Sequence, residues 1–372
     1  MLLTRPAALP FGGKVVVCSG DPGQTLPIIP GGSRGDVVSH LLTRDPLWKH
    51  FATHTLEINM RIGRLANDGN RATLAAYNEW LMKARVGALS VADGTRDMVE
   101  VAPGFDVARE INTSTPETIQ ASMHQCAADV YPDFENNWNT STYLAARAVL
   151  CATNEEVDAI NQLLLDQVPG AVSTLTSVDR VSVCSEEAAE RDGVDTEALN
   201  ASTVPGVPAH ALVVKVGALG MIIRNINPAR GLVNGAKFVI VKILTAGVVM
   251  VRIVSGLPSA VGTVVPIPRT RFWMEPGKGP FDLKWSRLQF PFRLAYAVTI
   301  NKSQGQTLAR VGVWMLKPCF GAGQFYVAFS RVGSPENIVA YVPRDPTTNT
   351  LITRNVVYSE VFGAQGAQWF NR

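Results

Sequence analysis

The chain has 372 residues, of which 47% are hydrophobic and 17% are charged. This composition indicates a folded protein of two or three domains and excludes wholesale disorder. No apolar run reaches the roughly 18 residues of a membrane-spanning helix. We therefore expect no membrane partner. The five cysteines form no Cys-x-x-Cys pair, which argues against a zinc ribbon or a disulfide framework, and we expect no metal site.

The net charge is only +3, but it is unevenly distributed along the chain. From residue 251 onward there are 14 Lys and Arg against 5 Asp and Glu, whereas the first 250 residues hold 20 against 26. This asymmetry favours a surface for a polyanion in the C-terminal third. An ordinary solvated basic face is the alternative.

The N-terminal part has the pattern of a strand followed by a polar loop. Val15, Val16 and Val17 are apolar and β-branched, which predicts a buried strand of a parallel sheet. The loop that follows is rich in Gly and Pro and presents Asp21 and Gln24. Ligands of α/β proteins bind at the carboxyl ends of strands, where such a loop would lie.

Further elements alternate in the α/β manner. The sequence predicts a short helix within residues 33–51, a strand over 53–62 and an amphipathic helix over 65–85. A strand that ends at Cys151 is followed by a helix capped by Thr153 or Asn154. The apolar stripe of this helix consists of Val157, Ile160, Leu164 and Val168.

The composition changes in the second half of the chain. Residues 182–203 are acidic and predict a surface loop or a disordered insert. Residues 205–290 contain short β-rich runs separated by Gly, Pro and Asn, which predict a small all-β barrel inserted in the larger domain. The α/β pattern resumes at residue 291, and residues 344–372 are expected to form a loosely attached tail.

The segment 297–308 places a dense polar group directly after an apolar strand. Its polar residues include Thr299, Asn301, Lys302, Ser303, Gln304, Gln306 and Thr307. Lys302 can pair with a phosphate, and the hydroxyls and amides can hydrogen-bond to phosphate and sugar. Gly305 permits a close approach of the backbone. The alternative is that the segment is only a helix cap.

Two arginines and one glutamine each end an apolar segment. Arg61 closes "INMR", Arg331 closes "YVAFSR", and Gln24 lies in "GDPGQTLP". Together they could converge on the terminal phosphate of a nucleotide, because a guanidinium binds phosphoryl oxygens in bidentate fashion. A surface or interface position is the alternative for each arginine.

Six collinear motifs carry a family resemblance. They are "GDPGQTLPIIPGGSR", "LEINMR", "LCATNEEVDAIN", "LVVKVGALGMIIRNINPARGLVNG", "TINKSQGQTL" and "YVAFSR". In this order they resemble the Pif (petite integration frequency) DNA helicases, closest to the eukaryotic branch that includes the Helitron-transposon helicases. The likeness runs from about Phe11 to Pro343.

The resemblance implies an ATP-dependent DNA helicase that moves 5′ to 3′ on single-stranded DNA, with ATP and Mg²⁺ as cofactors. It also implies a nuclear monomer that acts in DNA repair, recombination, telomere maintenance or Helitron transposition. The implied fold is α/β: residues 1–54 are the C-terminal remnant of a first RecA-like motor domain, and residues 55–204 and 291–343 form a second. Residues 205–290 are an inserted Src-homology-three-like β-barrel, and residues 344–372 are the tail.

The resemblance also implies roles for single residues. Gln24 senses the γ-phosphate, Asp21 couples that signal to DNA, and Arg61 and Arg331 are arginine fingers. Gly305 belongs to the nucleotide site, and the residues that link single-stranded DNA to the ATP cleft are Thr299, Lys302, Ser303, Gln304 and Thr307. Where the family often has an aromatic–Arg pair, this chain has Pro22-Gly23, a departure that we expect to weaken local contacts.

Two elements of an ATP-hydrolysing motor are absent from the sequence. The Gly-Lys pairs at 13–14 and 277–278 lack the spacing of the phosphate loop G-x-x-x-x-G-K-[ST]. No Asp-Glu dipeptide is present to hold Mg²⁺. We therefore expect a C-terminal, truncated portion of a helicase that is inactive alone.

The alternative is a non-catalytic fragment that binds single-stranded DNA or a helicase partner. Five aromatic residues near basic residues could stack on bases: Phe272, Trp273, Trp285, Phe290 and Tyr296. Most of them are expected in the core.

Overall fold

The structure is a computed structural model. It describes residues 10–29, 31–54, 56, 60, 69–89, 97–182, 185–191, 193–244, 247–277 and 279–365. The chain divides into two compact units. The first unit comprises Met1–Ser122 and Ser303–Arg372, and the second unit comprises Met123–Lys302. Each unit is described by itself.

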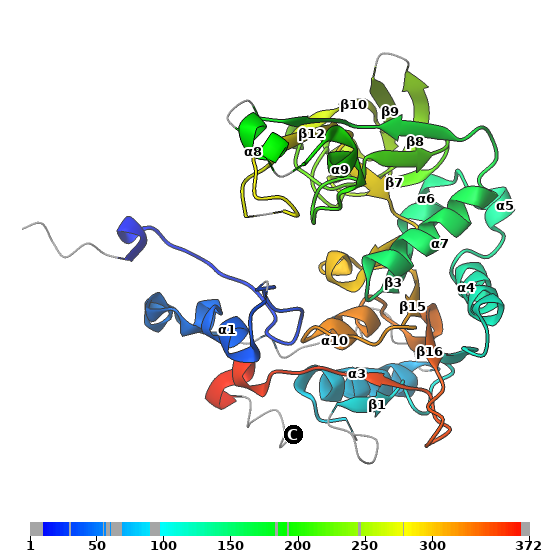
Figure 1. The fold of residues 1–372 in the computed structure, drawn as a ribbon. Helices are drawn as coiled ribbons and strands as arrows, with labels where there is room; N and C mark the ends of the chain where they lie inside the picture. Colours follow the sequence, from blue (N-terminus) through cyan, green and yellow to red (C-terminus); the bar gives the residue numbers. More distant parts are fainter. Residues whose placement is uncertain are drawn as a thin grey trace, which may run out of the picture. The chain divides into compact units, whose positions relative to one another are not determined.

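The described residues form both helices and strands (Figure 1), and no α-helix separates the consecutive strands β6 to β15. The α-helices are α1 (Arg34–Ser39), α3 (Arg71–Val86), α4 (Pro116–Val130), α5 (Phe134–Asn137), α6 (Ser141–Ala145), α7 (Asn154–Gln167), α8 (Glu186–Arg191), α9 (Thr196–Ala201) and α10 (Gln324–Phe329). The strands up to residue 253 are β1 (Met98–Glu100), β2 (Ala108–Ile111), β3 (Arg147–Cys151), β4 (Ser173–Thr176), β5 (Val178–Val181), β6 (Ala211–Val214), β7 (Leu219–Ile222), β8 (Lys237–Leu244) and β9 (Val248–Ile253). The later strands are β10 (Val264–Pro268), β11 (Thr270–Met274), β12 (Trp285–Gln289), β13 (Phe292–Leu294), β14 (Ala297–Thr299), β15 (Arg310–Trp314), β16 (Ile338–Pro343) and β17 (Ile352–Arg354).

Parallel strands form the centre of the first unit. β16 pairs in parallel with β15 on one side and with β2 on the other. The residues from Ile338 to Val342 are all buried, as expected for a parallel strand covered on both faces. This arrangement is of the α/β type that the strand and helix patterns predict.

Helix α3 confirms the amphipathic helix predicted within 65–85 over its described part. Its buried residues include Leu74, Tyr77, Trp80 and Leu81. The ring centroid of Trp80 lies 5.2 Å from that of Phe329 in α10, and the Tyr77 hydroxyl donates to the Phe329 carbonyl over 2.9 Å. These contacts hold α3 against α10.

The strand–helix pair predicted around Cys151 is confirmed in the second unit. Helix α7 begins with a capping box, in which the Thr153 side chain accepts from the Glu156 amide and Glu156 accepts from the Thr153 amide. Strands β3 and β14 pair in parallel beside this helix. The Asn161 side chain of α7 both donates to and accepts from the backbone of Ala297, which satisfies polar groups of β14.

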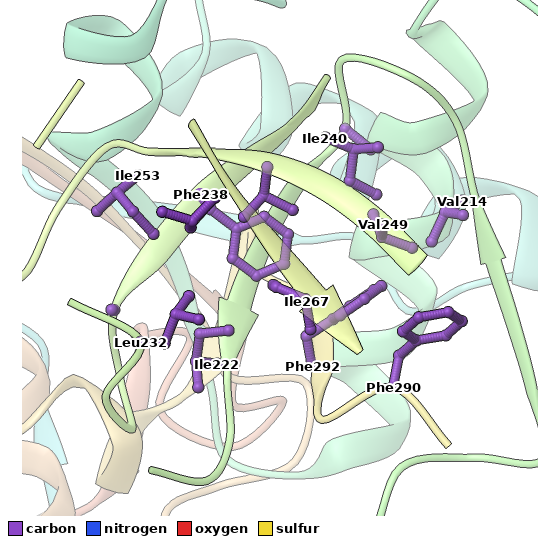
Figure 2. Close-up of a cluster of buried hydrophobic side chains, with 14 of the residues drawn as sticks. Val214, Ile222, Leu232, Phe238, Ile240, Val249, Ile253, Ile267, Phe290 and Phe292 are labelled. Atoms are coloured by element: carbon purple, nitrogen blue, oxygen red, sulfur yellow. The ribbon is translucent and has the colours of Figure 1, made fainter. Parts of the chain in front are cut away.

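An antiparallel sheet with the strand order β10-β9-β8-β7-β13 accounts for most of the predicted β-rich segment. Figure 2 shows its core, in which Phe290 and Phe292 lie among branched aliphatic side chains such as Ile240 and Ile267. Burying each such side chain contributes about 1.5–3 kcal/mol. Strands outside the predicted limits of 205–290 also belong to this β-rich part, because β4 pairs with β6 and β13 with β7.

A second sheet of the same unit has the strand order β11-β12-β5. Arg287 of β12 and Asp179 of β5 form an ion pair with 0% exposure of both side chains and a closest distance of 2.7 Å. The Arg287 guanidinium also donates to the carbonyls of Leu199 in α9 and of Ser202. The described part of 182–203 contains the helices α8 and α9 instead of the predicted surface loop or disordered insert. The buried guanidinium holds the C-terminal end of α9 through these two carbonyls.

The strand predicted at Val15–Val17 is wrong. Residues 14–20 have no regular secondary structure, and Val15 and Val17 are 93% and 88% exposed. A strand needs backbone partners, and no described strand pairs with this segment. Most of the strand predicted over 53–62 lies outside the described residues.

The segment 344–365 is attached more firmly than the predicted loose tail. Strand β17 pairs with β1, and Thr353 is buried. The Asn355 side chain donates to the Ala84 carbonyl at the end of α3 over 2.9 Å. The Arg354 guanidinium is 2.7 Å from the Asp97 carboxylate. These long-range contacts bind the segment to the first unit. Among the described helices, none is both long enough and apolar enough to cross a membrane.

Candidate functional site

Asp21 organises the loop that carries Gln24. Its Oδ1 accepts from the Gly23 amide at 3.0 Å and from Arg85 Nε at 2.9 Å. A second guanidinium nitrogen of Arg85, Nη2, lies 2.8 Å from the same oxygen. Asp21 Oδ2 accepts from Gln24 Nε2 at 3.3 Å. Because Arg85 lies in the last turn of α3, the carboxylate joins this loop to α3. Arg85 was not singled out in the sequence, since 64 residues separate it from Asp21.

Two glycines allow the loop to lie close to its neighbours. A Cβ atom on the buried Gly23 would overlap the side chain of Arg85. Gly323 has a positive φ of 76° and precedes α10, and a Cβ atom there would overlap the carbonyl of Gln24. The Pro22-Gly23 departure from the family pattern was expected to weaken local contacts. In the structure Gly23 instead makes room for the Arg85 contact.

Tyr326 of α10 completes the surroundings of Asp21. Burial raises the pKa of Tyr326 to about 12, and the Asp21 carboxylate, to which Tyr326 is hydrogen-bonded, adds to the increase. The positive charges of Arg85 and Arg331 act on the same hydroxyl in the opposite sense. Tyr326 therefore lies within electrostatic reach of both the Gln24 loop and Arg331.

Arg331 is buried, with 4% exposure, directly after α10. Its guanidinium donates to the carbonyls of Val327 at 2.7 Å, Gln306 at 3.2 Å and Ser303 at 3.4 Å. It also donates to Ser330 Oγ at 2.7 Å. The side chain of Arg331 therefore holds the segment 303–306 to the end of α10. It does not lie at the exposed surface, which was the alternative for this arginine.

The predicted DNA-contact residues of the first unit follow one another in the segment 303–307. Ser303 is buried, whereas Gln304 and Thr307 are exposed. Gly305 has a φ of 80° and open space where a Cβ would be. The Thr25 hydroxyl donates to Gln304 Oε1, so the Gln24 loop and this segment are in direct contact within the first unit.

Thr299 and Lys302 lie in the second unit, and both are half-buried. Burial lowers the pKa of Lys302 to about 8, and the nearby positive charge of Arg293 adds to the decrease. Burial also lowers the pKa of Arg293, which the Asp158 carboxylate partly offsets. The Arg293 guanidinium donates to Asn154 Oδ1 at 3.3 Å. Two half-buried cations that act on each other electrostatically favour an anionic ligand. Arg293 was missed because it lies inside an apolar run.

The remaining predictions concern Arg61 and metals. Arg61 lies outside the described residues. Within the described ranges, no group of three or more His, Cys, Asp and Glu could hold a metal ion. Of the five aromatic residues considered for base stacking, Phe272, Trp285, Phe290 and Tyr296 are buried and Trp273 is exposed.

Comparisons with known sequences give two matching families. "PIF1-like helicase" matches residues 2–95, and "DNA helicase Pif1, 2B domain" matches residues 197–243. The ATP-dependent DNA helicase PIF1 of Danio rerio is 34% identical over 191 residues, which are 51% of this chain and 26% of that protein. The chain thus spans about a quarter of the length of this curated relative.

Two solved structures resemble the fold. The crystal structure of Pif1 helicase from Candida albicans has a TM-score of 0.58 and 22% identity, and the match covers 98% of this chain and 70% of that one. The crystal structure of Pif1 helicase from Bacteroides in complex with ADP-AlF3 and ssDNA has a TM-score of 0.57 and 17% identity, with coverages of 97% and 68%. These matches confirm the α/β fold class with RecA-like architecture.

Proposed function

We propose that this chain is a portion of a PIF1-like helicase and takes part in the ATP-dependent 5′ to 3′ unwinding of DNA, because two family models and the Danio rerio relative match parts of it. The observation that carries the proposal is the set of contacts around Asp21. They join the Gln24 loop to α3 and bring it near Tyr326 of α10, the helix that leads to Arg331. The proposal makes Gln24 the γ-phosphate sensor and Arg331 an arginine finger, and two such groups must respond to the same nucleotide. The contacts around Asp21 support this pairing, because they bring the two segments close together.

In this proposal Gln24 hydrogen-bonds the terminal phosphate, and Arg61 and Arg331 neutralise its charge. Arg331 now donates to the Ser303 and Gln306 carbonyls. Turning the guanidinium toward a phosphate would release these carbonyls, and thereby the segment that presents Gln304 and Thr307. Arg331 would in this way couple the nucleotide to the DNA contacts of the first unit.

Single-stranded DNA is the proposed polymer partner. In the first unit the contacts come from Ser303, Gln304 and Thr307. In the second unit Thr299 and the cation pair of Lys302 and Arg293 contact phosphates. Hydroxyl, amide and cationic groups of this kind bind the phosphate and sugar without reading the base sequence, which suits a motor that moves along any strand.

ATP and Mg²⁺ are the proposed cofactors, but the chain fits them only in part. Gln24, Arg331 and Gly305 are suited to the terminal phosphate. The sequence has no phosphate loop and no Asp-Glu dipeptide, and its described residues include no metal-binding cluster. We derive no step through Mg²⁺, and we propose that the 372-residue chain is inactive alone. We also propose that the protein is a nuclear monomer that acts in DNA repair, recombination, telomere maintenance or Helitron transposition.

The first test measures binding of the chain to a fluorescent oligo(dT) by anisotropy over a series of salt concentrations. We expect salt-sensitive binding that Lys302→Ala and Arg293→Ala each weaken roughly tenfold. Lys83→Ala is the matched control, because Lys83 is an exposed lysine of α3 paired with Glu79. Binding that ignores both salt and the first two variants would contradict the DNA part of the proposal.

The second test measures ATP hydrolysis by the same chain with Mg²⁺ and single-stranded DNA. We expect none above background, because no phosphate loop holds the nucleotide. Hydrolysis that disappears in Arg331→Ala would overturn the expected inactivity and support a complete motor. DNA binding that ATP does not alter would favour the second candidate, a non-catalytic binding fragment, to which the missing phosphate loop also points.

A further inference from the structure

The exposed face of the β11-β12-β5 sheet presents one unused aromatic side chain. The antiparallel register places Trp273 opposite Ser286, and Ser286 opposite Arg180. Residues directly opposite one another project to the same face of a sheet. The neighbouring row, Phe272, Arg287 and Asp179, is buried on the other face. Trp273 and Arg180 therefore lie on the same face of the sheet, where both are exposed, whereas Ser286 between them is buried.

Trp273 is 54% exposed on this surface. Tryptophan is highly buried on average, and the four other aromatics considered for stacking are all in the core. The Arg271 guanidinium carbon and the Lys284 ammonium each lie 5.7 Å from the centroid of the indole ring. Both cations are attracted to the π-electrons of the ring, and this attraction restricts the orientation of the indole.

The charge around the ring is mainly positive. Arg180, Arg271 and Lys284 contribute cations, whereas Glu275, paired with Lys284 at 2.9 Å, contributes a carboxylate. The Arg271 side chain is held in place, since it donates to Ser286 Oγ over 2.9 Å. An aromatic platform with cations beside it is the arrangement with which proteins bind single strands, by stacking on bases and pairing with phosphates.

We propose that this surface, defined by Arg180, Arg271, Trp273 and Lys284, binds a segment of single-stranded DNA. One base stacks on the indole of Trp273, and the flanking phosphates pair with the three cations. A duplex fits poorly, because its bases are stacked on one another and offer no free face. The inference rests on the proposed function for the identity of the polyanion, and it adds a stacking surface to the phosphate contacts of Lys302 and Arg293.

The test uses the full chain with oligo(dT) in which single positions carry 5-iododeoxyuridine. Irradiation should attach the oligonucleotide to Trp273, located by mass spectrometry. Trp273→Ala should weaken anisotropy-measured binding roughly tenfold, and Trp273→Phe should restore most of it. Phe11→Ala, at another exposed aromatic, is the matched control and should leave affinity unchanged. An unchanged thermal unfolding curve of Trp273→Ala shows that the exposed residue does not support the fold.

The outcomes separate this inference from the proposed function. Unchanged affinity of Trp273→Ala and no crosslink at residue 273, while Lys302→Ala binds more weakly, would overturn the inference and leave the proposed function standing. No binding of oligo(dT) by the unaltered chain would overturn both. If poly-glutamate displaces the oligonucleotide as well as oligo(dT) does, the surface is a site for acidic polymers and the inference is wrong.

Discussion

Removing the charge of Asp179 should sharply destabilise the second unit. Asp179 and Arg287 are fully buried, with contacts of 2.7, 2.9 and 3.1 Å between carboxylate and guanidinium. Asp179→Asn keeps the volume of the side chain, so it opens no cavity. It leaves the guanidinium of Arg287 in the interior without a counter-charge.

The size of the effect follows from this geometry. Removing one partner of a buried ion pair costs about 3–5 kcal/mol. The lower end applies here, because Arg287 keeps the carbonyls of Leu199 and Pro208 as acceptors at 2.7 and 3.1 Å. With a typical urea dependence of about 2 kcal/mol per molar, the midpoint should fall by about 1.5 M.

Urea unfolding followed by tryptophan fluorescence and circular dichroism measures this shift. Asp106→Asn is the control, because Asp106 pairs with Arg109 but its side chain is 92% exposed, and it should not move the midpoint. A double replacement, Asp179→Leu with Arg287→Met, should remain destabilised, since it removes the hydrogen bond that Arg287 donates to the Pro208 carbonyl over 3.1 Å. If Asp179→Asn unfolds at the same urea concentration as the unaltered chain, the reasoning on the buried pair is refuted.

Burial lowers the pKa of Lys237 from 10.5 to about 8, so the unfolded chain binds more protons between these values and stability rises with pH there. Lys237→Met should remove this rise, which is measured as the difference between the urea midpoints at pH 7 and at pH 9.5. The same pH dependence in the unaltered chain and in Lys237→Met would contradict the prediction. Gly217 has a φ of 90°, and a Cβ there would overlap the Trp138 ring. Gly262 has a similar φ of 87° but open space where a Cβ would be. Gly217→Ala should therefore lower the urea midpoint more than Gly262→Ala, and equal shifts would show that the overlap with Trp138 has no effect. Burial lowers the pKa of Lys302 to about 8, so this side chain loses its positive charge between pH 7 and 9 and the affinity for oligo(dT) should fall. Lys302→Arg should abolish that fall, because an arginine stays charged. Binding by the unaltered chain that does not depend on pH would argue against a contact of Lys302 with phosphate.

Local sequence patterns determined several elements of this protein. The capping box of α7 and its apolar stripe involve residues within a few turns of one helix, so the pattern around Thr153 predicted the helix and its start. The Gly-, Pro- and Asn-punctuated runs predicted the antiparallel strands in the same way. The polar group at 299–307 also follows a strand, β14, as predicted.

Tertiary structure decided the features that depend on distant partners. The Val15–Val17 run has the composition of a strand, but backbone pairing makes a strand, and no described segment provides it. The Asp21–Arg85 contact joins residues 64 apart, and the Asp179–Arg287 pair joins residues 108 apart.

The five aromatic residues near basic side chains illustrate the same limit. They look alike in the sequence, yet only Trp273 is exposed in the structure. The alternation of β11 places Phe272 on the buried face and Trp273 on the open one. Composition and motifs therefore predicted the fold class and indicated which known proteins the chain resembles. Which side chains meet, and which face solvent, depends on strand register and long-range packing, which only the folded chain provides.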